Sequence, residues 1–131
     1  MVKKTVNYKN FNGDDITEEL YFNLTKTELI KLQNSMPEGF DKYLDSAIKN
    51  KDVKKIMEIF EKIILLSYGE KSEDGKHFNK SDSIRENFQS TEAYDEIFTE
   101  FLEKPDEFKN FIEAVIPQGL VKDNSLEKLG A

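Results

Sequence analysis

The chain has 131 residues, of which 37% are hydrophobic and 34% charged, and its formal net charge is −7. This length suits about one domain, and the composition is too hydrophobic for a disordered chain. We expect no membrane span and no signal peptide, because the longest apolar run covers only 63–66. The absence of cysteine excludes disulfides and cysteine-based metal sites.

The N-terminal segment is predicted to form a β-hairpin. Residues 2–11 and 16–24 flank Asn12-Gly13, and Asn-Gly is the strongest short hairpin signal because both residues tolerate positive φ. Apolar and polar residues alternate in the second arm with the two-residue period of a strand. A lone hairpin is at best marginal in water, so we expect its apolar face to pack on helices.

Short amphipathic helices are predicted to follow. Thr25 and Glu28 have the spacing of a capping box, which indicates a helix from there to about Ser35. Pro37 and Gly39 should break it.

The most apolar helix is predicted after Asp52, which can cap it. An amphipathic pattern over 40–48 precedes it, and the segment 53–66 is apolar on several sides. We expect this helix to be the central one and Gly69 to end it through a left-handed cap.

The remainder is predicted to contain an exposed loop over 70–80 and further short helices over 81–88, 91–102 and 105–115. The predicted fold is mainly α (α+β): an N-terminal β-hairpin (1–24) packed on a compact bundle of about five or six short helices (25–117). We expect one domain over 1–117 and a flexible C-terminal tail over 118–131.

Acidic residues are concentrated in the last two predicted helices. Between Glu92 and Glu113 there are eight acidic and two basic residues, so this segment carries −6 of the total −7. A negative surface repels phosphate backbones and anionic lipids. We therefore expect no nucleic-acid partner and no membrane partner, and a basic protein partner is favoured.

The sequence offers little for a metal site. The single histidine, His77, lies in the polar loop without a second histidine or cysteine, which favours a surface residue over a zinc ligand. The loop from Glu70 places Gly75 at the sixth position of a calcium-binding loop, but Ser81 stands where a bidentate glutamate is needed. We expect no metal and no cofactor.

Catalysis is also disfavoured. Glu92, Glu96 and Glu100 share one helical face and could bind a cation or serve acid–base chemistry, but a solvated helix face is the simpler interpretation. No phosphate-cradling loop or nucleophile elbow is present. The sequence therefore predicts a non-enzymatic protein.

The candidate partner-binding residues come from the acidic segment. Phenylalanines at helical spacing are core residues by default, although an apolar strip edged with carboxylates would suit a basic amphipathic helix in a groove. The candidates are Phe98, Phe101, Phe108, Phe111, Ile112, Glu96 and Glu100.

The order of motifs in residues 5–117 resembles one known family. The motifs are Asn12-Gly13, then 21–26 with Glu28-Leu29, then 63–72 with 74–78, and finally Phe88, Ala93-Tyr94, Ile97-Phe98, Phe111-Ile112 and Ile116-Pro117. The most specific part is Ser67-Tyr68-Gly69-Glu70-Lys71-Ser72 followed by Asp74-Gly75. This series resembles the tail assembly chaperones of long-tailed phages and prophages of Gram-positive bacteria.

The resemblance implies a binding function. Such chaperones coat the tape measure protein in the host bacterial cytoplasm while the tail tube polymerises, and they are absent from the mature virion. The tail tube protein and self-association are further interactions that we consider. In many relatives a ribosomal frameshift produces a longer second product.

Two readings from other functional classes remain open. An acidic inhibitor or DNA mimic would act on a host nucleic-acid enzyme through its carboxylates, and neutralising those of four glutamates should then abolish its action: Glu92, Glu96, Glu100 and Glu103. A small metal-dependent enzyme would be stabilised by divalent ions.

Overall fold

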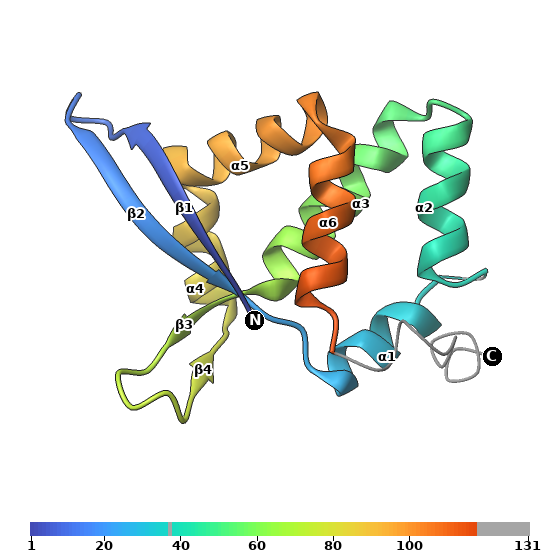
Figure 1. Ribbon diagram of the computed structural model, residues 1–131, viewed down its shortest axis with the longest axis horizontal. Helices are drawn as coiled ribbons and strands as arrows, with labels where there is room; N and C mark the ends of the chain where they lie inside the picture. Colours follow the sequence, from blue (N-terminus) through green and yellow to red (C-terminus); the bar gives the residue numbers. More distant parts are fainter. Residues whose placement is uncertain (37, 118–131) are drawn as a thin grey trace.

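The computed structural model describes residues 1–36 and 38–117, which form four strands and six helices (Figure 1). The strands are β1 (Val2–Lys9), β2 (Asp15–Phe22), β3 (Tyr68–Lys71) and β4 (Phe78–Asn79). The helices are α1 (Lys26–Asn34), α2 (Phe40–Lys49), α3 (Val53–Ser67), α4 (Asp82–Gln89), α5 (Glu92–Glu103) and α6 (Pro105–Val115). The predicted mainly α (α+β) fold with an N-terminal hairpin is confirmed. The break predicted at Pro37 and the tail predicted over 118–131 lie outside the described residues.

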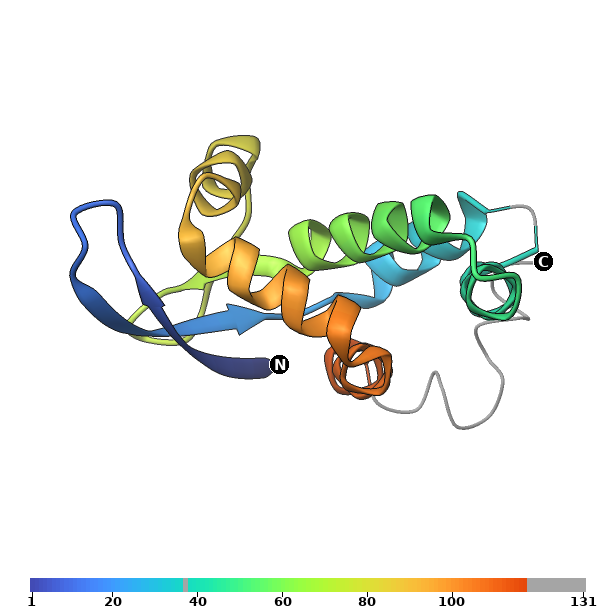
Figure 2. The same ribbon diagram turned by 90° about the horizontal axis from the view of Figure 1, so that it is seen from above.

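The four strands form an antiparallel sheet in the order β1-β2-β3-β4. β1 and β2 pair along their whole length, from Val2 opposite Phe22 to Lys9 opposite Asp15. β3 reaches β2 only at Tyr21 and Phe22. Most of the first hairpin therefore extends beyond β3, and one end of it projects past the helices (Figure 2).

Asn10 holds the turn of the first hairpin. Its Oδ1 accepts hydrogen bonds from the backbone N–H groups of Asn12 at 3.0 Å and Asp14 at 2.9 Å. Only Gly13 in this loop has a positive φ, 84°. The connection is therefore the five-residue loop 10–14. β1 ends at Lys9, two residues before the predicted end of the first arm, and β2 begins at Asp15, one residue before the predicted start of the second.

A second hairpin occupies the segment that was predicted as an exposed loop. In β3 and β4, Glu70 lies opposite Asn79 and Lys71 opposite Phe78. The loop prediction for 70–80 was wrong at both ends, because strands of four and two residues are too short to show an alternating pattern. Their position depends on pairing with β2, which is distant in the sequence.

Gly69 was predicted to end α3 through a left-handed cap. This prediction was wrong, because the φ angle of Gly69 is not positive. It lies in β3, where an added Cβ would stand 2.6 Å from Cε2 of Phe78 and 2.9 Å from the carbonyl oxygen of Asn79. Glycine at this position allows the close approach of the two strands.

The predicted helix caps are present. Thr25 N–H donates to Oε1 of Glu28 at 2.9 Å, and Glu28 N–H donates to Oγ1 of Thr25 at 3.1 Å, which completes the capping box of α1. The side chain of Asp52, the other predicted cap, accepts from the first turn of α3. The side chains of Ser81 and Thr91 do the same for α4 and α5. Each cap satisfies a backbone donor that the helix leaves free.

Only the C-terminal part of α3 is central. Its buried residues are Ile59, Phe60, Ile63, Ile64 and Ser67, whereas Val53 is 60% and Met57 41% exposed. α3 contacts α2, α5 and α6. In the N-terminal half, Ile56 of the predicted apolar stripe packs on the core, whereas Val53 and Met57 stay at the surface.

An aromatic cluster joins the sheet to the helices. Phe22 of β2 meets Phe111 of α6 edge to face at 5.2 Å between ring centroids, and Phe88 of α4 at 6.0 Å. Phe60 of α3 lies 3.9 Å from Phe108 of α6. Because strand, α3, α4 and α6 all contribute rings to one cluster, the hairpin and the helices share a single core.

Lys80 ties three separate segments together. Its Nζ lies 2.7 Å from Oε1 of Glu28 and donates to the carbonyl oxygen of Asn23 at 2.6 Å. Burial would raise the pKa of Glu28, but the hydrogen bonds from Lys80 and Thr25 and the charge of Lys80 outweigh it, so this pKa lies below its ordinary value. Burial lowers the pKa of Lys80 despite the attraction of Glu28. The pair fixes the start of α1 beside the segment that follows β4.

Candidate functional site

The seven predicted partner-binding residues are divided between the core and the surface. The buried ones are Phe101, Phe108, Phe111 and Ile112, with exposed fractions of 1 to 6%. Phe98 is half-buried, Glu96 is exposed and Glu100 is partly exposed. The predicted apolar strip edged with carboxylates is therefore not an open surface in this structure.

The buried phenylalanines are held by one another. The ring of Phe101 lies 5.3 Å from Phe108 and 5.1 Å from Phe111. Phe98 packs at the margin of the cluster, 6.1 Å from Phe60 and tilted against a neighbouring tyrosine. These rings face inward because α5 and α6 pack on β1 and α3. The sides of α5 and α6 that make these contacts are the apolar sides marked by the sequence pattern. A partner could reach the buried ones only by opening the core.

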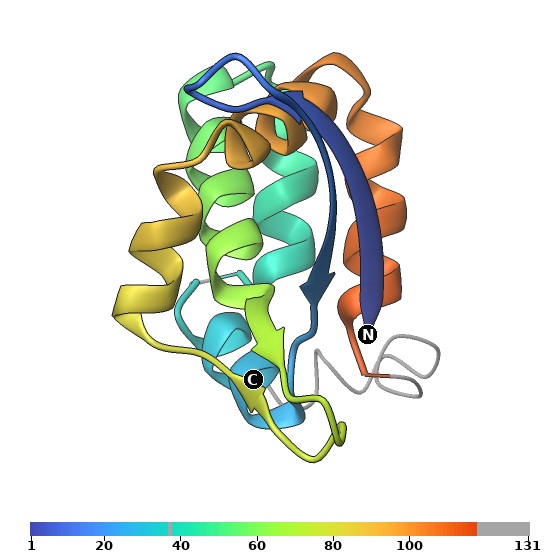
Figure 3. The ribbon, with the colours of Figure 1, turned by 90° about the vertical axis from the view of Figure 1, so that its left-hand side faces the viewer.

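The two acidic candidates lie in a groove between α5 and β1. Its volume is ≈ 480 Å³, and Figure 3 shows α5 crossing beside β1 at this end of the molecule. The residues that line it are Thr5, Val6 and Asn7 of β1 and Glu96, Thr99, Glu100, Glu103 and Lys104 at α5. The groove thus combines a strand margin with an acidic helix face.

The groove keeps uncompensated negative charge. Nζ of Lys4 lies 3.0 Å from Oε2 of Glu100 and 5.4 Å from the centre of the Phe101 ring, so this pair is tied to the core. Within residues 1–36 and 38–117, Glu96 and Glu103 have no ion pair. Lys104 also lines the groove, but among the described residues it forms no ion pair with Glu96 or Glu103, so both carboxylates can still meet a cation from another chain.

β1 contributes a free backbone edge to the groove. Asn10 N–H donates to the carbonyl oxygen of Asp14 at 3.0 Å, and this pair continues the β1–β2 register. Hydrogen-bonded and non-hydrogen-bonded pairs alternate in an antiparallel ladder, so Val6 bonds to β2 while Thr5 and Asn7 direct their N–H and C=O groups outward. Among the described residues, no other backbone group bonds to these outward groups. The edge is open for hydrogen bonding.

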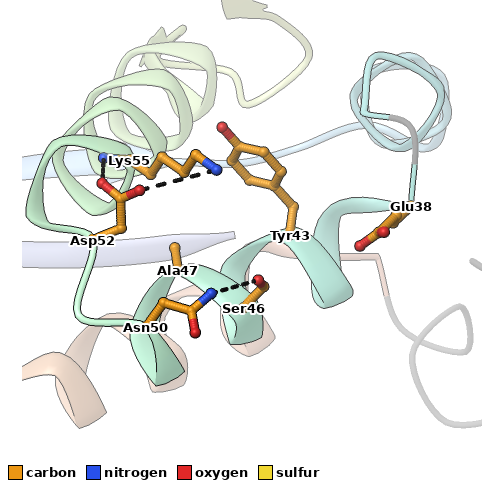
Figure 4. Close-up of a pocket in the computed structure, with 7 residues that line it drawn as sticks. All are labelled: Glu38, Tyr43, Ser46, Ala47, Asn50, Asp52 and Lys55. Atoms are coloured by element: carbon orange, nitrogen blue, oxygen red, sulfur yellow. Dashed lines mark hydrogen bonds and ion pairs between the residues drawn. The ribbon is translucent and has the colours of Figure 1, made fainter.

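Two other hollows lie at α2. One, of ≈ 300 Å³, is drawn in Figure 4: Nδ2 of Asn50 donates to Ser46 at 3.3 Å, and the ammonium of Lys55 lies 3.9 Å from Asp52 and over the ring of Tyr43. These contacts pair Asn50 with Ser46 and Lys55 with Asp52 within the hollow. The second, of ≈ 380 Å³, lies between α2 and α6 and includes the predicted residue Ile112 in its wall.

The acidic residues and the single histidine were also considered as metal ligands. No three histidine, aspartate or glutamate side chains there are grouped so that they could hold a metal ion. His77 lies in the loop between β3 and β4, where its backbone N–H donates to Oγ of Ser72 at 3.0 Å. In residues 1–36 and 38–117, no helix is long and apolar enough to cross a membrane.

The sequence did not single out Thr5, Val6 and Asn7 as site residues. Their alternation marks a strand, but which side of that strand remains unpaired depends on the order β1-β2-β3-β4. One signal of an unpaired edge was available. The first strand of a hairpin pairs on one side with the next strand of the chain, and its other side stays unpaired unless a distant strand reaches it. Glu103 was considered only among the carboxylates of the inhibitor hypothesis and not as a partner-binding residue of the chaperone.

Comparison with known proteins supplies a family. The family model described as phage tail assembly chaperone matches residues 1–128, nearly the whole chain. No curated protein and no solved structure gave a significant match. The match agrees with the resemblance in the motifs of residues 5–117. The chain therefore belongs to the phage tail assembly chaperone family.

Proposed function

We propose that this chaperone binds the tape measure protein of a phage tail and keeps it soluble while the tail tube assembles around it. The observation that carries the proposal is the family match over residues 1–128. A long helical protein that waits for its tube exposes apolar surface, and a chaperone that covers this surface prevents aggregation. The protein would act in the host cytoplasm, without catalysis, and leave before the virion is complete.

The charge distribution supports a basic client segment. The segment from Glu92 to Glu113 carries −6 of the total −7, and it forms α5 and α6. Its exposed carboxylates include Glu96 beside the groove. Carboxylates on one face increase the rate of encounter with a basic partner and discriminate against acidic ones.

Several weak contacts along one client would suffice. If many copies bind side by side on a long client, the array gains avidity although each copy binds weakly. Contacts between copies, or with the tail tube protein, would add to this effect. The buried phenylalanines of α5 and α6 would then serve mainly to hold the acidic helices in place, and half-buried Phe98 is the candidate for a direct apolar contact.

Co-expression with the tape measure protein of the same phage tests the proposal. We expect the client to move from the insoluble to the soluble fraction and to co-elute with the chaperone in size-exclusion chromatography. An unrelated acidic protein of similar charge is the control for a general charge effect. A client that stays insoluble, with no complex, would refute the proposal, and binding of a host nucleic-acid enzyme instead would favour the inhibitor.

A further inference from the structure

The open edge of β1 lies directly beside carboxylates that lack partners. We propose that an extended segment of the tail client, with basic side chains at alternate positions, adds to this edge as a fifth strand of the sheet. The inference rests on the proposed function only for the source of the segment, namely the chaperoned tail protein. The edge and the groove themselves are features of this chain.

The backbone of β1 is suited to pair with an incoming strand. Thr5 and Asn7 are exposed and direct their N–H and C=O groups outward. The β1–β2 register runs without interruption from Val2 to Lys9, so no bulge twists the edge away, and β1 contains no proline. Proline, bulges and lysine side chains are common devices by which proteins block an exposed edge. The lysines of β1 are each paired with a carboxylate of this chain: Lys3 with Glu19, Lys4 with Glu100 and Lys9 with Asp15. An added strand would satisfy the free groups of β1, as in other cases of strand addition.

The side chains of the groove specify a basic segment. Successive side chains of a strand alternate between the two faces of a sheet, so every second residue of an added strand would face α5. There it would meet Glu96 and Glu103, which have no ion pair among the described residues, while Lys4 already occupies Glu100. Lysine or arginine at alternate positions would neutralise the two free carboxylates.

A second copy of this chain is a less suitable occupant of the edge. Pairing β1 with β1 of another copy would bring the two α5 helices to the same junction. Glu96, Glu100 and Glu103 of both copies would then gather around one seam. Like charges at close range oppose association, so the electrostatics favour a basic chain over self-pairing.

A peptide probe with backbone resolution tests the inference. The probe is a labelled peptide of about ten residues in which lysine alternates with valine or threonine, long enough to cover the edge. Amide hydrogen exchange of the full chain should then slow by on the order of tenfold at Thr5 and Asn7. Val6 should change little, because its N–H already bonds to β2. Binding without this alternating pattern would overturn strand addition.

Proline substitution separates edge pairing from general attraction. Thr5→Pro removes an outward N–H and leaves the bonds between β1 and β2 in place, so we expect at least about tenfold weaker peptide binding. Thr17→Pro is the matched control, since Thr17 lies opposite Asn7 and directs its N–H to the other side of the hairpin, where β3 does not reach. Circular dichroism of both variants checks that they fold.

A charge variant keeps the test decisive if a proline variant does not fold. Glu96→Gln with Glu103→Gln should weaken binding of the lysine peptide by about tenfold or more. Asp95→Asn with Glu107→Gln removes equal charge from exposed positions outside the groove and should have a much smaller effect. Equal losses in both double variants would overturn the assignment of the groove.

The outcomes for the edge and for the chaperone function can be told apart. A peptide that binds at β1, together with a client that stays insoluble, would leave the edge site standing and refute the chaperone function. A soluble client whose complex is unaffected by Thr5→Pro and by the groove variant would refute the edge site alone. A dimer of the peptide-free chain that Thr5→Pro abolishes would assign the edge to a second copy and overturn the inference.

Discussion

At the scale of single residues, the buried Phe101 and the half-buried Phe98 of α5 have different roles. Phe101 is 1% exposed and touches three other rings, of which Phe60 is the most distant at 6.4 Å. Phe98 is half-buried at the margin of the same cluster. One is a core residue, whereas the other has a face free for a contact.

Alanine substitution of these two residues should separate the roles. We expect Phe101→Ala to lower the free energy of unfolding by about 3–5 kcal/mol, because it leaves a cavity among packed rings. Phe98→Ala should cost less, about 1–2 kcal/mol, since less apolar area is lost from the core. Urea denaturation measures both. A cost below about 1 kcal/mol for Phe101→Ala would contradict its place in the core.

Residue patterns predicted what is local and missed what depends on distant neighbours. The caps Thr25 and Asp52 were predicted correctly, because a cap is defined by bonds within three residues of chain. Gly69 was misread because its constraint comes from Phe78, across a hairpin that the pattern did not reveal. Phe101 was marked as an apolar helix residue, but its pattern could not tell core from interface.

At the scale of elements, the sheet and α1 are joined by the pair of Lys80 and Glu28. The side chains are 11% and 21% exposed, and Lys80 also donates to the carbonyl oxygen of Asn23 after β2. Breaking a largely buried pair leaves one charge without compensation. The pair should therefore contribute to stability only while both groups are charged.

Acid should remove this contribution. The pKa of Glu28 in the folded chain lies below its ordinary value of 4.5, so its stabilising effect is complete above that pH and is lost as the pH falls through the folded-state pKa. Glu28→Gln keeps the capping hydrogen bonds but not the charge. We expect it to be less stable than the wild type by about 1–3 kcal/mol near neutral pH. The difference should shrink at an acidic pH below the folded-state pKa of Glu28.

Urea denaturation of both proteins at the two pH values measures this difference. Glu58→Gln is the matched control, because Glu58 is exposed on α3 and has no ion pair among the described residues. A difference for Glu28→Gln that stays constant with pH would mean that the charge of Glu28 does not stabilise the fold.

Helices and strands were predicted correctly where the periodic pattern of apolar residues extends over many residues. The eight-residue strands and the helices from α1 to α6 were all expected from caps, chain breakers and apolar residues at strand or helix spacing. β3 and β4 were not, since they contain few residues and their polar sequence matches a loop equally well. The first half of α3 was expected to be buried but has Val53 and Met57 exposed, although α2 packs on this helix and Ile56 reaches the core.

At the scale of the whole molecule, the sequence predicted the fold class but not the groove. The groove exists because α5 crosses beside the outer strand of the sheet, which places Glu96 and Glu103 near Thr5 and Asn7. Neither the strand order nor the crossing follows from any local pattern. Only the acidic side of the groove could be anticipated, from the concentration of charge between Glu92 and Glu113.

The central claim is that this chain prevents the aggregation of a tape measure protein. Light scattering of the purified tape measure protein, diluted from denaturant into buffer with increasing amounts of the chaperone, tests it most directly. We predict that scattering falls with chaperone concentration until the client is saturated, and that Glu96→Gln with Glu103→Gln requires a higher concentration than Asp95→Asn with Glu107→Gln. Scattering that is unchanged at saturating chaperone would contradict the account.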